Sequence, residues 1–183
     1  EPNTEFYSRP PLLPGEQALE AIAQRGHALL LESGFDHYEV SAYQRGGAAR
    51  HNLNYWQFGD YLGIGAGAHA KLSAIENGQL TVRRRHNSRR PDDYLSRSDP
   101  LAAEQCIDRA ELPLEFMLNA LRLREGVAAD LFSQRTGLEL AAIEPQLAAL
   151  RRQGLLEASA ERLQTTPLGY RFLNSVVAAF DPA

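Results

Sequence analysis

A glycine-rich stretch near the centre of the chain limits what this sequence can fold into more than any other feature. Four glycines fall within the eleven residues 59–69, closely following residues 50–56, which contain the only tryptophan. Backbone with so few side chains allows a ligand or another backbone segment to approach closely. We therefore expect an irregular surface that grips a flat aromatic ligand, rather than a regular core element.

The same stretch matches a dinucleotide-binding fingerprint, G-x-G-x-x-[GA], at residues 63–68. That fingerprint requires a helix directly after it. Here a hairpin is predicted instead, because Asn77-Gly78 is a strong two-residue turn signal between apolar residues in 71–75 and 80–82. The sequence therefore argues against a Rossmann site.

The segment before this stretch has the pattern of a parallel α/β fold. Residues 16–33 predict an amphipathic helix, and the alternation in residues 38–43 predicts a strand. A helix that leads into a strand is half of a βαβ unit. Glu39 and Ser41 would then share one polar face, which indicates either a ligand-lined barrel interior or an edge strand with one face in water.

The segment after residue 82 predicts a linker and then a helical domain. Residues 83–100 are arginine-rich and then contain proline and aspartate, so the arginines either pair with carboxylates or phosphates or are simply solvated. Expected beyond them are helices at 101–124 (interrupted near Pro113), 128–135, 141–153 and 167–180, with two short strands, 155–157 and 162–165, forming a wing. This order is a winged-helix plan.

Composition excludes several classes of protein. The single cysteine, Cys106, excludes an internal disulfide and any metal site built from several thiolates. The net charge of -4 argues against a nucleic-acid-binding role. The sequence contains no run of about 18 apolar residues, the length that a transmembrane helix requires. We expect a cytoplasmic protein.

His51 is the clearest candidate ligand in residues 50–56. Its imidazole could coordinate haem iron while Tyr55 and Trp56 stack on the porphyrin. The alternative is a solvated loop histidine beside aromatic residues packed in the core.

The segment His51-Asn52-Leu53-Asn54-Tyr55-Trp56, followed by residues 59–69, closely resembles the HemW haem-chaperone family. Members of this family are radical S-adenosylmethionine (SAM) proteins similar to oxygen-independent coproporphyrinogen III oxidase. The resemblance extends from residues 1–4 to residues 163–169 and so covers nearly the whole chain.

The resemblance implies a fold class of α/β + α: the closing repeats of a partial (β/α)6 radical-SAM barrel, followed by a winged-helix-like C-terminal domain. The expected boundaries are residues 1–75 for the barrel part, 76–100 for the hairpin and linker, and 101–183 for the C-terminal domain. The family's N-terminal part carries three cysteines that bind a [4Fe-4S] cluster, to which SAM is coordinated. We expect this chain to be a C-terminal portion that lacks those cysteines and is inactive in SAM cleavage.

The resemblance also assigns residues to sites. The haem-binding residues it implies are His51, Asn52, Tyr55 and Trp56, with His51 as the one metal ligand. The SAM-cavity residues it implies are Glu39, Ser41, Gly63, Gly65, Gly67 and His69, and no catalytic residue is assigned.

The expected function, within porphyrin metabolism, is to bind haem and transfer it to an acceptor protein. The alternative is SAM-dependent oxidative decarboxylation of coproporphyrinogen III, and a remote alternative is a winged-helix nucleic-acid-binding module. We also expect self-association, because apolar surface would be exposed where barrel strands should pack.

Overall fold

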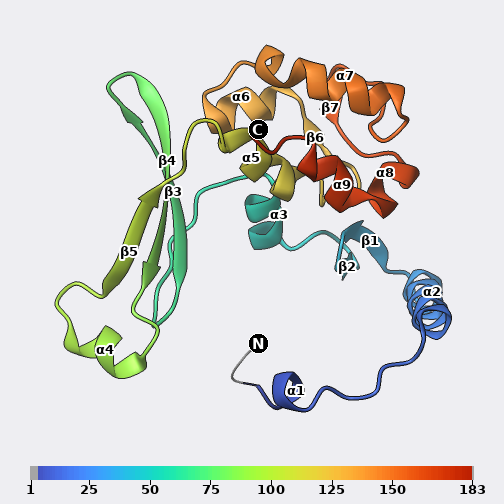
Figure 1. Cartoon of the computed structure of the whole chain (residues 1–183), viewed down its shortest axis with the longest axis horizontal. Helices are drawn as coiled ribbons and strands as arrows, with labels where there is room; N and C mark the ends of the chain where they lie inside the picture. Colours follow the sequence, from blue (N-terminus) through green and yellow to red (C-terminus); the bar gives the residue numbers. More distant parts are fainter. Residues whose placement is uncertain (1–3, 183) are drawn as a thin grey trace.

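The computed structural model describes residues 4–182, which form an open arc of three parts (Figure 1). At one end lie α1, α2 and a small two-stranded sheet, and at the other a three-stranded sheet, with a helical unit between them. The elements of the first part are α1 (Glu5–Ser8), α2 (Glu16–Glu32), β1 (Asp36–Glu39) and β2 (Ala42–Gln44), and α3 (Arg50–Trp56) follows them.

The three-stranded sheet is built on the predicted hairpin. β3 (His69–Glu76) and β4 (Gln79–Asn87) pair antiparallel around Asn77-Gly78, and both turn residues have positive φ, 50° and 77°. This confirms the hairpin and matches the backbone that such a two-residue turn requires. α4 (Pro91–Ser96) then leads to β5 (Leu101–Cys106), which pairs with β4.

The linker prediction for residues 83–100 was therefore wrong, because residues 83–87 are the second half of β4 and residues 91–96 are helical. Ion pairs hold this arginine-rich segment: Arg83 pairs with Glu76 and Glu104 and Arg85 with Glu104 across the strands, and Arg84 pairs with Glu115 of the helix α5 (Leu112–Ala120). The sequence left open whether these arginines pair with carboxylates or phosphates or are solvated. Pairing with carboxylates is confirmed for Arg83, Arg84 and Arg85.

The helical unit holds most of the buried core. Its elements are α5 (Leu112–Ala120), β6 (Val127–Ala128), α6 (Asp130–Thr136), η1 (Leu140–Ile143), α7 (Glu144–Arg152), β7 (Arg162–Leu163), α8 (Pro167–Arg171) and α9 (Leu173–Ala178). Phe116 and Phe132 are fully buried and pack edge to face, with ring centroids 5.4 Å apart. The same core takes in Phe58 and Val82, so it also joins the chain after α3 to the sheet.

Several predicted helix boundaries here are confirmed. Gly137 ends α6 in the left-handed conformation, and Thr166 caps α8, its side chain accepting a hydrogen bond from the Gly169 amide. Other predictions were wrong: residues 101–106 form β5 instead of helix, and the last helix is divided at Phe172 into α8 and α9. Leu156 does bridge to Thr165, but β7 pairs with β6.

The predicted strand over residues 38–43 is two strands. β1 and β2 run antiparallel and are joined by a turn at Val40 and Ser41. The turn is stabilised by the Glu39 carboxylate, whose Oε1 accepts hydrogen bonds from the Ser41 amide and hydroxyl. The expected parallel pairing was therefore wrong at this point, and within residues 4–182 every paired strand is antiparallel.

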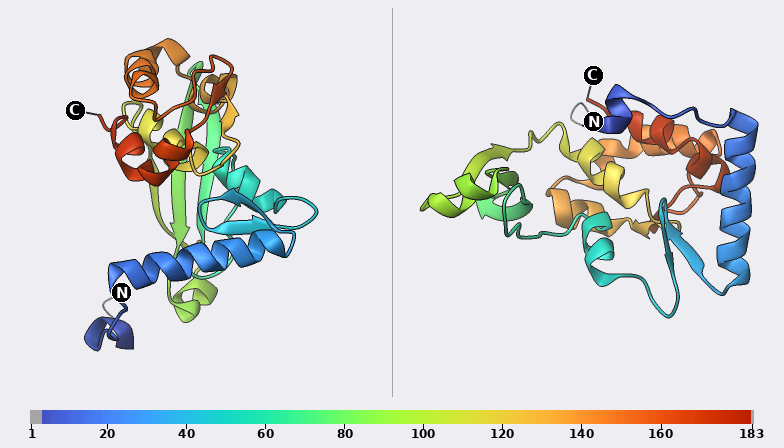
Figure 2. Two further views of the ribbon diagram at one scale, coloured as in Figure 1. Left: turned by 90° about the vertical axis from the view of Figure 1, so that its right-hand side faces the viewer. Right: turned by 90° about the horizontal axis from the view of Figure 1, so that it is seen from below.

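Helix α2 confirms the amphipathic helix predicted there but buries none of its residues. Its apolar residues Leu19, Ile22 and Leu29 remain 42%, 62% and 46% exposed. The β1–β2 hairpin lies between α2 and the helical unit (Figure 2, left). Leu19, Ile22 and Leu29 on the apolar side of α2 are therefore left largely uncovered by residues 4–182, whereas Leu30 is partly buried. No described helix is long and apolar enough to cross a membrane.

Candidate functional site

The predicted haem motif forms a two-turn helix, α3, which corrects the expectation of an irregular loop at residues 50–56. Residues four apart lie on the same side of a helix. His51 and Tyr55 therefore share one face of α3, and Asn52 and Trp56 share the neighbouring face.

The face with His51 and Tyr55 is directed outward. Both residues are exposed, Tyr55 at 37%, and their ring centroids lie 6.4 Å apart. Tyr55 also packs edge to face against Tyr61, at a centroid distance of 4.6 Å. An accessible imidazole thus lies beside the Tyr55 ring, which itself packs on Tyr61. Imidazole ligates haem iron and aromatic rings pack on a porphyrin face, so this face has the chemistry to bind a flat metal macrocycle.

The face with Asn52 and Trp56 is directed toward the rest of the protein. The Asn52 side chain donates a 2.9 Å hydrogen bond to the Tyr38 hydroxyl. The guanidinium of Arg122 lies over the Trp56 ring, 4.3 Å from its centroid. These two contacts hold α3 against the β1–β2 hairpin and the end of α5.

Glu39, predicted to line a SAM cavity, is 1% exposed and paired with Arg122. Its Oε2 accepts hydrogen bonds from Arg122 Nε at 3.2 Å and Nη2 at 3.0 Å. Ser41 satisfies the other carboxylate oxygen. Both oxygens are therefore bonded within the protein, and this pair supports the position of α3.

A cavity of about 220 Å³ lies between α3 and the sheet. Its lining combines aromatic and cationic side chains: Tyr55, Trp56, Phe58, Tyr61, Lys71, Arg84 and Asn119. Lys71 is only 3% exposed, and its ammonium lies 3.1 Å from Asp60 Oδ1 and 4.0 Å from the Phe58 ring centroid.

Burial shapes the titration of this cavity wall. Desolvation lowers the pKa of Lys71, and the Asp60 hydrogen bond opposes that shift only in part. For Asp60, desolvation raises the pKa, but hydrogen bonds from Ser73 and Lys71 outweigh it and lower the pKa below its ordinary value. Burial raises the pKa of the Tyr61 hydroxyl.

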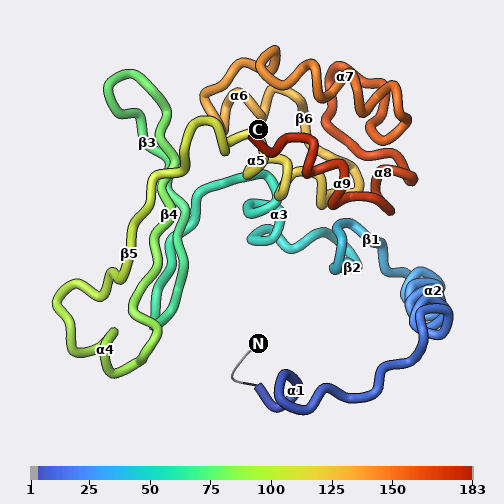
Figure 3. The backbone as a smooth tube through the Cα atoms, in the orientation of Figure 1, coloured from blue at the N-terminus to red at the C-terminus, as the bar shows by residue number. Residues whose placement is uncertain are grey.

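Residues 63–68 form a loop, whereas a cavity-lining strand was expected. The chain runs from α3 along the sheet to the end next to α4 before β3 begins (Figure 3). A Cβ on Gly63 would lie 2.2 Å from the His69 carbonyl oxygen, and Gly65 and Gly67 have φ of +109° and +69°. The close approach that glycine permits at Gly63 is thus between two parts of this backbone.

The glycine loop is fastened to its neighbours in the sheet and α4. The Asn87 side chain donates hydrogen bonds to the Gly63 and Gly65 carbonyls, and the Gly65 amide donates to the Tyr94 hydroxyl. The predicted SAM residues thus lie in two places: Glu39 and Ser41 lie beside Arg122, and the glycine loop lies beside α4.

His69 opens β3 and lies directly opposite His86 on β4, with ring centroids 5.5 Å apart. A cluster of three or more metal-ligating His, Cys, Asp or Glu side chains is absent from the described part of the chain. The one cysteine, Cys106, is exposed on β5. A [4Fe-4S] cluster bound by several thiolates does not fit the residues of this chain.

The structure thus joins the four predicted haem residues on α3 and adds Tyr61, Lys71, Arg84 and Arg122 to their surroundings. No local pattern in the sequence indicated these additions, because they come from a loop, two strands and the residues after α5. The predicted hairpin could have indicated two of them, because its register around Asn77-Gly78 places Lys71 opposite Arg84.

The fold and the site together define a class of protein. Residues 107–172 match the family model described as the HemN C-terminal domain. The structure of coproporphyrinogen III oxidase (HemN) from Escherichia coli, a radical SAM enzyme, superimposes with a TM-score of 0.64 over 92% of this chain and 42% of that chain, at 17% identity. The mixed α/β fold is therefore that of part of HemN.

The sequence comparison narrows the class to one family. The chain is 41% identical to "Heme chaperone HemW" of Haemophilus influenzae and to that of Escherichia coli, over 98% of its own length and 46% and 47% of theirs. It is 30% identical over 90% of its length to "Radical S-adenosyl methionine domain-containing protein 1, mitochondrial" of Bos taurus. The chain belongs to the HemW family, and it spans about half the length of the curated relatives it matches.

Proposed function

We propose that this chain is the haem-binding part of a haem chaperone that transfers haem to an acceptor protein. The observation that carries the proposal is the outward face of α3, where exposed His51 lies beside Tyr55, whose ring packs on Tyr61. Neutral imidazole is a common haem-iron ligand, and aromatic rings pack on the porphyrin face. The identity with relatives named heme chaperones supports this assignment.

We propose that haem binding and cluster binding are carried out by different parts of a longer protein. The [4Fe-4S] cluster and SAM would be held by residues outside this chain, since its single cysteine cannot supply three thiolate ligands. Residues 1–75 would then close a partial (β/α)6 barrel, and residues 101–183 would form a winged-helix-like domain. The order of α5, β6, α6, α7 and β7 supports the second assignment.

Coproporphyrinogen oxidation is the less favoured function. The likeness to the HemN structure, at 17% identity, supports a shared fold only. The curated relatives with 41% identity carry the chaperone name instead. The proposed partners are haem and a haem-acceptor protein, and nucleic acid is not among them. The proposed location is the cytoplasm.

Replacing His51 by alanine is expected to weaken haem binding roughly tenfold or more, because a direct iron ligand matters at least as much as the outer-shell groups whose loss has that effect. Haem is titrated into the chain and the variant, and the Soret band and dissociation constant are compared. His27→Ala serves as the control, since His27 bonds Tyr43 between α2 and β2. If His51→Ala and the parent chain give the same spectrum and affinity, His51 is not a ligand.

We also propose that the chain self-associates through α2, whose apolar residues are exposed. Light scattering across a concentration series is expected to show a mass that rises above that of one chain. Ile22→Lys is expected to reduce this rise, because Ile22 is 62% exposed on α2, whereas Leu168→Lys on α8, 48% exposed, is expected to change it little. A constant monomeric mass of the parent chain would contradict the proposal.

A further inference from the structure

The cavity between α3 and the sheet has a feature that haem binding through α3 alone does not explain. Its second wall is the face of β3 and β4 that carries Lys71 and Arg84, which lie directly opposite each other in the strand register. Successive residues of a strand point to opposite faces. Two cations are therefore placed side by side in a lining that also holds Tyr55 and Trp56.

The size of the cavity fits one edge of a large ligand. Pockets that enclose a whole drug-sized molecule usually measure about 300–1,000 Å³, and this one measures about 220 Å³. Its aromatic side continues onto the outward face of α3 through Tyr55, which contacts both His51 and Tyr61. A flat ligand that lies along α3 can thus place one edge in the cavity.

The two cations differ in what they offer that edge. Lys71 has 4% of its side chain exposed and is held by Asp60 and the ring of Phe58. Arg84 has 49% of its side chain exposed and pairs with Glu115 through one terminal nitrogen. A guanidinium has five N–H donors in a planar fork that matches a carboxylate. Arg84 therefore retains donors for an incoming carboxylate.

We propose that this cavity binds a propionate-bearing edge of haem and that Arg84 recognises the propionate carboxylate. The proposal rests on the haem-binding function proposed above, and it assigns to the sheet a role in selecting the ligand. Lys71, whose ammonium is paired with Asp60, lies beside Arg84 in the lining, and Tyr55 and Trp56 supply aromatic surface there.

The test compares haem with haem dimethyl ester, in which both carboxylates are masked. The parent chain is expected to bind haem roughly ten- to a hundredfold more tightly than the ester, the ratio that one charge-assisted hydrogen bond supplies. Arg84→Gln is expected to bring this ratio close to one.

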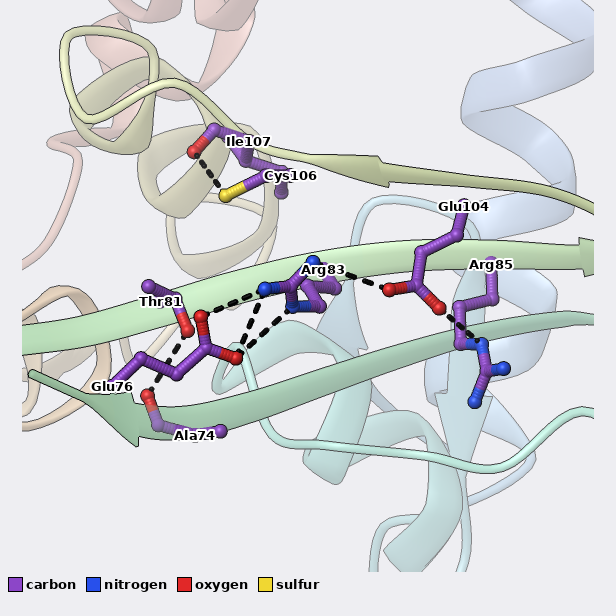
Figure 4. Close-up of polar contacts among 8 residues, drawn as sticks. All are labelled: Ala74, Glu76, Thr81, Arg83, Arg85, Glu104, Cys106 and Ile107. Carbon is purple, nitrogen blue, oxygen red and sulfur yellow. Dashed lines mark hydrogen bonds and ion pairs between the residues drawn. The ribbon is translucent and has the colours of Figure 1, made fainter.

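Arg83→Gln is the matched control. Arg83 is the preceding residue of the same strand and lies on its opposite face, where it pairs with Glu76 and Glu104 (Figure 4). Its substitution removes the same charge and is expected to preserve the preference for haem. A second variant, Arg84→Gln with Glu115→Gln, keeps the net charge of the parent chain and is expected to lose the preference, which excludes an effect of an unpaired Glu115.

The outcomes separate the two proposals. If the parent chain binds haem and the ester equally, or if Arg83→Gln and Arg84→Gln reduce the ratio alike, propionate recognition by Arg84 is wrong and haem binding stands. If the parent chain binds neither haem nor the ester, both proposals fail.

Discussion

Replacing Arg122 by alanine is expected to lower the free energy of unfolding by about 3–5 kcal/mol. The Glu39 carboxylate is 1% exposed and takes two hydrogen bonds from the Arg122 guanidinium. Without Arg122, a buried carboxylate keeps only its bonds from Ser41, which leaves its charge uncompensated. Urea denaturation followed by fluorescence measures the change, and Trp56, the only tryptophan, lies directly under Arg122.

Arg124→Ala is the control for this prediction. Arg124 is exposed, stacks on Tyr170 with its guanidinium 4.9 Å from the ring centroid, and has a long 3.5 Å contact from Nη1 to His37 Nδ1. Its loss is expected to cost about 0.5–1 kcal/mol, as for an exposed cation–π contact. Adding Glu39→Gln to Arg122→Ala should recover part of the loss, because the uncompensated charge is then removed. Equal effects of the two arginine substitutions would show that the Glu39 pair carries no special share of the stability.

The parts of the fold that the sequence predicted are those governed by local backbone chemistry. Asn77-Gly78 favours one turn geometry, Gly137 a left-handed helix end, and Thr166 with Pro167 a helix start. Each depends on the conformational preferences of the residues at that position. These signals therefore survive without knowledge of the tertiary structure.

The parts that were mispredicted depend on distant partners. Helix α3 has seven residues, too few to be stable by itself, and is held by contacts to Tyr38 and Arg122. The alternation over residues 38–43 predicted one strand with Glu39 on a polar face, but the chain turns at residues 40–41. Glu39 is instead buried against Arg122, an arginine 83 residues away in sequence. Burial by a distant partner leaves no periodic pattern.

The candidate site likewise has a part that the sequence predicted and a part that depends on tertiary packing. The resemblance placed His51, Asn52, Tyr55 and Trp56 in one motif, and helical geometry shows why two of them are accessible and two support the helix. The cationic wall with Lys71 and Arg84 required the strand register and the packing of α3 against the sheet.

Replacing Phe116 by alanine is expected to lower the free energy of unfolding by about 3–5 kcal/mol, the usual cost of emptying a fully buried phenylalanine site. Phe116 is 0% exposed and packs edge to face against Phe58 and Phe132, at centroid distances of 5.8 and 5.4 Å. Phe58 follows α3 closely and lines the cavity. The substitution should therefore weaken the link between the site and the helical core, besides leaving a void.

Phe172→Ala makes the same chemical change at a residue that is 53% exposed, between α8 and α9. Its expected cost is within about 0.5–1 kcal/mol, because little apolar area leaves the core. Both variants are compared by urea denaturation, and Phe116→Leu, which retains most of the buried volume, should fall between them. If Phe116→Ala costs no more than Phe172→Ala, the edge-to-face cluster does not anchor the site. In that case the contacts of α3 to Arg122 and Tyr38 would matter more for its position, and the Arg122 variant would be the one expected to disrupt haem binding.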